Sequence, residues 1–132
     1  MKNKPPPSET IKIYLKNAKR RIHSAKVLLK AKEYNDAVSR AYYAFFDAAS
    51  AALLKEGLSA KTHHGLILLF DKYFIKTKKM PLKIGRWLSR AKEAREEADY
   101  EVRKGFTKEH TEEAIKEAQE FVNAVEKMLK LK

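Results

Sequence analysis

The chain contains no cysteine among its 132 residues, so disulfide bonds, zinc–thiolate sites and thiol nucleophiles are excluded. Chain breakers are also scarce, with four glycines and four prolines, and three of the prolines stand together at positions 5–7. So few glycines and prolines over this length favour long helices over a many-stranded sheet.

Long apolar segments are missing as well. The longest run of large apolar residues, Leu66–Phe70, is far too short to cross a bilayer. No apolar stretch of signal-peptide type follows the polar residues Met1–Lys4. We therefore expect a cytoplasmic protein that does not enter a membrane.

The charged residues are unevenly distributed around a net charge of +12. The segment Lys12–Lys30 holds seven basic residues and no acidic one, Lys72–Lys92 has no carboxylate, and Glu93–Glu126 is mainly acidic. A basic side and an acidic side suit docking to a polyanion or to an acidic protein. The alternative explanation is the Lys/Glu-rich surface of a thermophilic protein, since Asn and Gln are scarce.

Apolar residues recur three and four residues apart and predict four long helices and one shorter helix. Short connections favour antiparallel neighbours, so the expected fold is an all-α, up-and-down antiparallel helical bundle. Residues 1–7 are predicted to form a disordered tail, because three prolines favour an extended conformation, and 8–132 a single domain. The predicted N-caps are Ser8, Asn35, Thr62 and Thr107. Gly57 is predicted to end the second helix. The fourth helix is expected from about Lys83 to Val102, before Gly105.

The second predicted helix is apolar over most of its circumference, which places it at the centre of the bundle or in an interface. Arg40 lies within it, and a buried arginine needs a partner. Asp36, one turn earlier, would form a structural ion pair with it. In the functional alternative, Arg40 and Tyr43 share one polar pocket with Arg95 and Tyr100 of the fourth predicted helix. Both interpretations stay open at this stage.

Three segments carry a resemblance to a known family. They read YNDAVSRAYYAFF at 34–46, THHG at 62–65 and REEADY at 95–100. In this order and spacing they resemble the HEPN family, in particular its small stand-alone prokaryotic members, along nearly the whole chain. The first segment is the most specific, since an Arg-Ala-Tyr-Tyr-Ala run on an alanine-rich helix is rare by chance.

The resemblance implies an up-and-down helical bundle, commonly a homodimer, with no cofactor. It also implies a partner, a minimal nucleotidyltransferase encoded beside it, in a pair where the HEPN protein is often the toxin. Many HEPN proteins are metal-independent ribonucleases, whose signature is an arginine, a polar residue directly after it, and a histidine four to six residues on. In some pairs the transferase attaches AMP to a tyrosine beside this motif, and Tyr100 is the corresponding candidate here.

The chain departs from the ribonuclease signature, because Tyr100 stands where the histidine would follow Arg95 and Glu96. Histidine titrates near neutrality and tyrosine near 10, so tyrosine is a poor acid/base substitute. Three functions therefore stay open: a HEPN subunit that binds a nucleotidyltransferase and a nucleotide or RNA, a ribonuclease using Arg95 with Tyr100 or His63, and a non-catalytic module that binds nucleotides or nucleic acid through Lys12–Lys30.

The remaining candidates have simpler alternatives. Arg95, Asp99 and Arg103 are spaced four residues apart, so they either form a surface ion-pair ladder or contribute Asp99 to the site beside Arg95. Arg103 and His110 match the ribonuclease spacing only across the predicted break at Gly105. His63 and His64 point about 100° apart on a helix and lack further ligands, so no metal site is expected.

Overall fold

The structure, a computed structural model, describes residues 7–100 and 105–130, and of residues 97–100 only the backbone. Five α-helices and one π-helical turn make up these residues, without any strand in the part described. Their order is α1 (Pro7–Lys30), α2 (Tyr34–Lys55), α3 (His63–Phe70), the π turn η1 (Asp71–Ile75), α4 (Leu82–Tyr100) and α5 (Lys108–Lys130). The predicted all-α class, with four long helices and one short helix, is confirmed.

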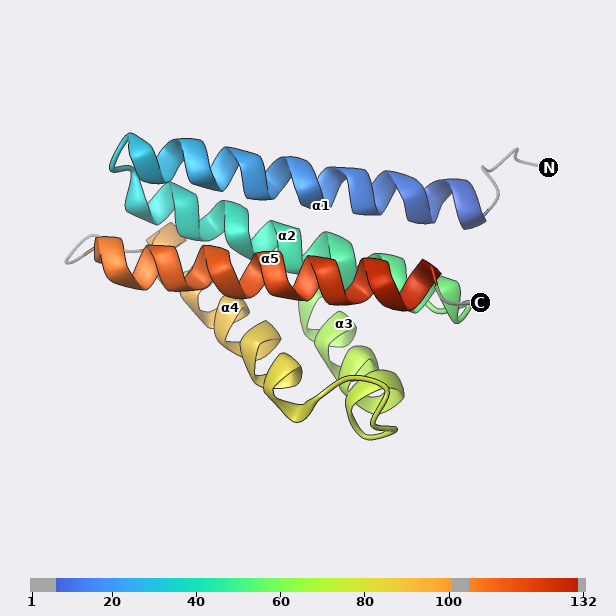
Figure 1. The fold of residues 1–132 in the computed structure, drawn as a ribbon. Helices are drawn as coiled ribbons and strands as arrows, with labels where there is room; N and C mark the ends of the chain where they lie inside the picture. The colour runs from blue at the N-terminus through green and yellow to red at the C-terminus, as the bar shows by residue number, and fades with distance from the viewer. Residues whose placement is uncertain (1–6, 101–104, 131–132) are drawn as a thin grey trace.

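Helices α1, α2 and α5 lie side by side, and α3 and α4 extend from beneath them (Figure 1). Successive long helices reverse direction, so the bundle is of the up-and-down type. Among the described residues no helix has an apolar stretch long enough to cross a membrane.

Helix α2 is the central helix, because α1, α3, α4 and α5 all pack against it. Its buried residues include a series of alanines, whose small side chains let the neighbouring helices approach closely. Phe45 of α2 meets Phe121 of α5 at 5.1 Å between ring centroids, and Phe121 meets Phe70 of α3 at 5.4 Å. These rings form the middle of the core, as expected for a helix that is apolar nearly all round.

Two of the four predicted N-caps are confirmed. The Thr62 hydroxyl accepts the backbone N–H of Gly65 at 2.9 Å, and the Thr107 hydroxyl accepts that of His110 at 3.0 Å. Each bond satisfies one of the backbone donors that a helix start leaves open.

The other two predicted N-caps are wrong. Helix α1 begins at Pro7, so Ser8 lies in its first turn, and α2 begins after Glu33, so Asn35 lies in its first turn. The Asn35 side chain instead accepts the backbone N–H of Phe106 at 3.0 Å and ties the start of α2 to the segment before α5. Gly105 allows this approach, since a Cβ there would come within 3.2 Å of the Asn35 oxygen. Val102, the predicted end of the fourth helix, lies outside the described residues.

Gly57 lies just beyond the end of α2, as predicted, and has a backbone φ of +77°. We expect Gly57→Ala to lower the free energy of unfolding by about 1 kcal/mol, because a Cβ is strained in the left-handed region. No atom lies within 4 Å of the new Cβ, so the effect comes from the backbone alone. Urea unfolding followed by circular dichroism measures it, and Gly57→Asn, which tolerates this region, should lose less. Equal stability of the alanine variant and the wild type would refute the explanation.

Candidate functional site

The side chains of Arg95 and His63 meet beside aromatic rings of α2. Nη2 of the Arg95 guanidinium lies 3.4 Å from Nδ1 of the His63 ring. Its Cζ stands 5.4 Å from the ring centroid of Tyr42 and 5.9 Å from that of Tyr43, at cation–π distance. The His63 ring packs on Phe46, with 4.4 Å between centroids. We call these five residues the Arg95 cluster.

Each member of the Arg95 cluster has a local reason for its position. Thr62 caps α3, so His63 is the first residue of that helix and projects where α3 leaves the bundle. Tyr42, Tyr43 and Phe46 lie within one turn of α2 and form an aromatic wall. Arg95 lies on α4, which packs against both α2 and α3. Three helices therefore hold the cluster together.

The one nitrogen of His63 that can accept a proton faces Arg95. A guanidinium only donates hydrogen bonds, so Nδ1 of His63 is the acceptor and the neutral ring carries its proton on Nε2. Burial lowers the pKa of His63 below its ordinary value of 6.5, and the positive charges of Arg95 and Lys92 lower it further against the opposing effect of Glu96. The neutral, basic form of His63 therefore predominates at pH 7.

Glu96 adds a carboxylate at the edge of the Arg95 cluster. Lys92 donates a hydrogen bond to it at 2.6 Å, one helical turn away, and this bond lowers the pKa of Glu96. The charge on Arg95 acts in the same direction. Glu96 therefore stays ionised at neutral pH and offsets part of the positive charge around His63.

Tyr42 serves as a wall of the Arg95 cluster and does not transfer protons. The residue is 1% exposed, and its hydroxyl has no hydrogen-bond partner among the described residues. Burial raises its pKa far above the usual value near 10, despite the nearby charge of Arg95. Its hydroxyl therefore stays protonated at any physiological pH.

The structure brings some of the predicted site residues together. Arg95, His63 and Tyr43 meet in the Arg95 cluster, whereas Arg40, which was expected to share a pocket with Tyr43 and Arg95, lines a groove with residues of α1. The side chains of Asp99 and Tyr100 lie outside the described residues. Arg103, one half of the spacing match with His110, lies outside them as well.

The expectation that Arg40 is buried is wrong. Arg40 is exposed, and within the described residues no ion pair joins it to Asp36, which is exposed too. It lines a groove together with residues of α1. The reason is that α2 leaves one strip of its surface uncovered by neighbouring helices, and Arg40 lies on that strip.

Sequence reasoning missed an ion pair between the half-buried Arg21 of α1 and the buried Asp47 of α2. Arg21 donates from Nε to Asp47 at 3.0 Å, and the Asp47 side chain is 8% exposed. Burial raises the pKa of Asp47, and the hydrogen bond and charge of Arg21 oppose that shift. An aspartate on an otherwise apolar helix face was the available signal, since a buried carboxylate requires a cationic partner.

The arrangement can bind an anion and move one proton. A guanidinium beside the ring can stabilise negative charge on a phosphate group, and the neutral imidazole can accept a hydroxyl proton. No group of three or more metal-ligating side chains lies close enough to hold a metal ion in the described part of the chain.

The chain is thus a small all-helical protein in which the Arg95 cluster lies between α2, α3 and α4. Comparison with known proteins gives the family: the profile of the HEPN domain matches residues 11–128. The chain therefore belongs to the HEPN family.

Two similar proteins of known sequence cover the chain almost entirely. A protein of Methanocaldococcus jannaschii named "Putative toxin MJ0605" is 38% identical over 122 residues, which are 92% of this chain and 90% of that protein. A "UPF0332 protein" of Thermotoga maritima is 35% identical over 119 residues, 90% of each.

One solved structure shares the fold. The crystal structure of TT1696 from Thermus thermophilus superimposes with a TM-score of 0.76 and 19% identity, covering 89% of this chain and 96% of that one. At this identity the likeness extends to the fold alone.

Proposed function

We propose that this chain is the HEPN subunit of a toxin–antitoxin-like pair and acts by binding a minimal nucleotidyltransferase. The proposal rests on the 38% identity, over 92% of this chain, to the protein named "Putative toxin MJ0605". The Arg95 cluster supplies a site for a nucleotide or RNA phosphate, and a homodimer and a cytoplasmic location are part of the proposal.

Expression in bacteria, alone and with the transferase encoded beside its gene, tests this proposal. We expect the chain alone to slow growth, and co-expression to restore growth and yield a complex that survives purification. Binding is expected at micromolar concentration or tighter, which corresponds to about 8 kcal/mol or more. A catalytically inactive transferase should still bind and separates binding from modification. No complex at micromolar concentration would refute the proposal.

Tyr100 is proposed as the acceptor of AMP from that transferase. The proposal rests, by resemblance, on its place at the end of the segment 95–100 that begins with Arg95. The intact mass of the co-expressed chain reports the modification, and the same chain carrying Tyr100→Phe is the control.

A second candidate function, a metal-independent ribonuclease, is favoured by one observation. His63 lies 3.4 Å from Arg95, so the chain has an imidazole beside the arginine although Tyr100 replaces the signature histidine. In this candidate Arg95 turns from Nδ1 of His63 to the phosphate and stabilises the charge that develops there. Nδ1 then accepts the proton of the 2′-hydroxyl, whose oxygen attacks the phosphorus, and the imidazolium returns that proton to the departing 5′-oxygen.

A further inference from the structure

A polar groove of about 310 Å³ runs between α1 and α2. Four of its residues, spaced three and four apart, form one stripe of α1, and α2 contributes the fifth. The groove is lined by Asn17, Arg20, Arg21, Ser24 and Arg40. Arg20 and Arg21 of α1 and Arg40 of α2 thus border one groove.

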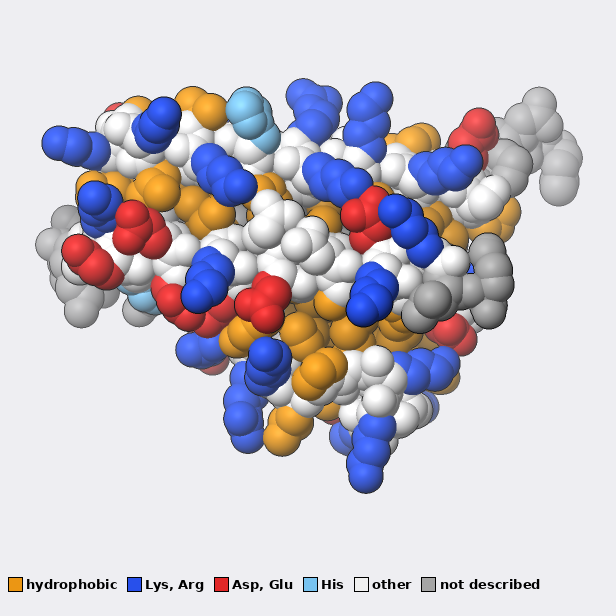
Figure 2. Space-filling model, viewed as in Figure 1, with side chains coloured by type: hydrophobic (Ala, Val, Ile, Leu, Met, Phe, Trp, Pro, Cys, Tyr) orange, Lys and Arg blue, Asp and Glu red, His pale blue; other side chains and the backbone are white. Residues whose placement is uncertain are grey.

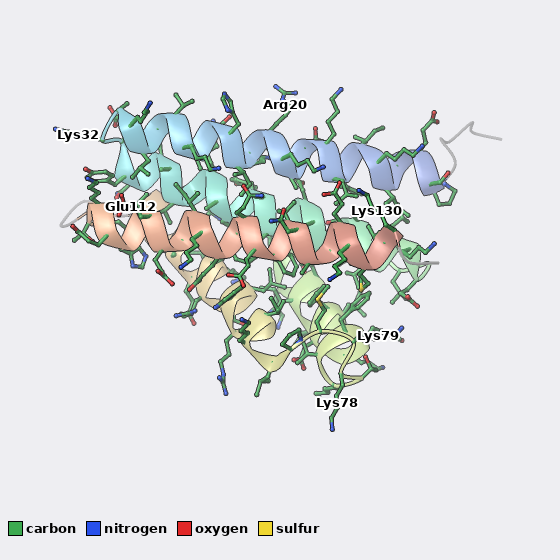
Figure 3. The ribbon with its side chains drawn as sticks, viewed as in Figure 1. Arg20, Lys32, Lys78, Lys79, Glu112 and Lys130 are labelled. Atoms are coloured by element: carbon green, nitrogen blue, oxygen red, sulfur yellow. The ribbon has the colours of Figure 1, made fainter. Side chains whose placement is uncertain are left out.

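The positive charge in this groove is largely unneutralised. Arg21 is held by Asp47 at 3.0 Å, which orients its guanidinium and cancels much of its charge. Arg20 and Arg40 are exposed and have no carboxylate partner in the described part of the chain. Figure 3 shows the labelled Arg20 pointing away from the bundle on α1. Two arginines are therefore available to a negatively charged ligand.

The hydrogen-bonding groups of the groove match a phosphate. Asn17 and Ser24 are half-buried, and neither side chain makes a hydrogen bond to the described residues. Arginine, serine and asparagine are among the side chains that contact nucleic-acid phosphates. The arginine fork also fits two phosphate oxygens at once. We propose that this groove binds the phosphodiester backbone of a single-stranded nucleic acid.

Two features favour an extended nucleic acid over a lone nucleotide or an acidic peptide. Figure 2 shows Lys and Arg side chains along α1 on the face that carries α5. Lys12 and Lys16 precede Arg20 on α1 at spacings of four residues, so they extend the positive charge along the helix beyond the groove; both are exposed and have no carboxylate partner among the described residues. Such a row neutralises successive phosphates.

The second feature is an aromatic ring at the edge of the groove. The Cζ of Arg21 lies 5.4 Å from the ring centroid of Tyr43, and Arg95 approaches the same ring at 5.9 Å. Tyr43 is half-buried and lies between the groove and the Arg95 cluster. Tyr43 thus links the groove to the Arg95 cluster, and a base that displaced one of these guanidiniums could stack on its ring, which an acidic peptide cannot do. The groove thus leads a strand toward the Arg95 cluster, and its binding role requires neither cleavage nor a transferase.

Binding of a fluorescein-labelled oligouridine of twelve nucleotides to the full chain, followed by anisotropy between 50 and 300 mM salt, tests the proposal. Each phosphate contact on a single strand contributes about −0.7 to the slope of log K against log salt. We expect Arg20→Gln with Arg40→Gln to make that slope shallower by about 1.4. Arg20→Lys with Arg40→Lys should keep the slope and weaken binding, because lysine keeps the charge and loses the fork.

The matched control removes two charges elsewhere. Lys61→Gln with Arg86→Gln changes two exposed cations that have no carboxylate partner in the described residues. The proposal predicts that this control binds like the wild type. If the control pair lost as much affinity as Arg20→Gln with Arg40→Gln, binding would depend on the net charge of the chain, and the proposal would be overturned. Competition by polyglutamate or ATP as strong as that by unlabelled oligouridine would overturn it in favour of an acidic protein or a nucleotide.

Discussion

His63→Ala is expected to lower metal-independent RNA cleavage by the purified protein by about 10²- to 10⁴-fold, the usual contribution of a positioned acid or base. The expectation follows from the 3.4 Å contact between His63 and Arg95, which places the base beside the group that binds phosphate. Cleavage of a labelled RNA in the presence of a chelator measures it. Arg95→Ala should cause a loss of similar size, since no other guanidinium contacts His63 in the described residues.

Two control variants make this result specific. His64 is the exposed neighbour of His63, so His64→Ala should retain activity. Tyr100→Phe removes only a hydroxyl, and full activity in it would exclude Tyr100 as a proton-transfer group. Activity that survives Arg95→Ala would reject the site. Folded wild-type protein that cleaves no RNA would refute the ribonuclease candidate and leave the binding role.

The pH dependence of cleavage provides a second test of the same base. The pKa of His63 lies below 6.5 because the ring is partly buried and faces Arg95 and Lys92. The rate should therefore rise as the pH increases through that lowered pKa and level off by about pH 7. Because the pKa of His63 is lower in the folded chain than in the unfolded chain, the unfolded chain binds a proton at His63 more readily. The free energy of unfolding should therefore decrease as the pH falls below 6.5.

The helix ends that could be predicted from the sequence are those whose bonds are local. Thr62 and Thr107 each bond a backbone N–H three residues ahead, and Gly57 needs only its own φ. Asn35 has the same capping chemistry, but its side chain bonds Phe106, which is 71 residues away. A tertiary hydrogen bond of that kind leaves no trace in the spacing of residues along one helix.

The candidate site could be predicted only in part for a similar reason. The resemblance identified Arg95, Tyr43 and His63 as candidates, but their meeting depends on how α3 leaves α2 and how α4 returns. Arg40 and Arg21 show the limit of periodicity. Periodicity separates apolar from polar faces and does not say which polar residue a neighbouring helix covers. Thus Arg40 is exposed, whereas Arg21 reaches the buried Asp47.

Phe121→Ala is expected to destabilise the fold by about 3–5 kcal/mol, the usual cost of truncating a buried aromatic residue. Phe121 of α5 is 0% exposed and touches Phe45 at 5.1 Å and Phe70 at 5.4 Å. Because these rings belong to three helices, relaxation of one helix cannot close the cavity that alanine would leave.

Urea unfolding followed by circular dichroism, with linear extrapolation to water, measures this loss of stability. The matched control is Leu68→Ala, since Leu68 is a large apolar residue that is 56% exposed, and its effect should stay within about 0.5 kcal/mol. A loss below about 1 kcal/mol for Phe121→Ala would contradict the central packing of α5 against α2 and α3. Because α2 and α3 also carry Tyr42, Tyr43 and His63, loosening this core should weaken the Arg95 cluster as well.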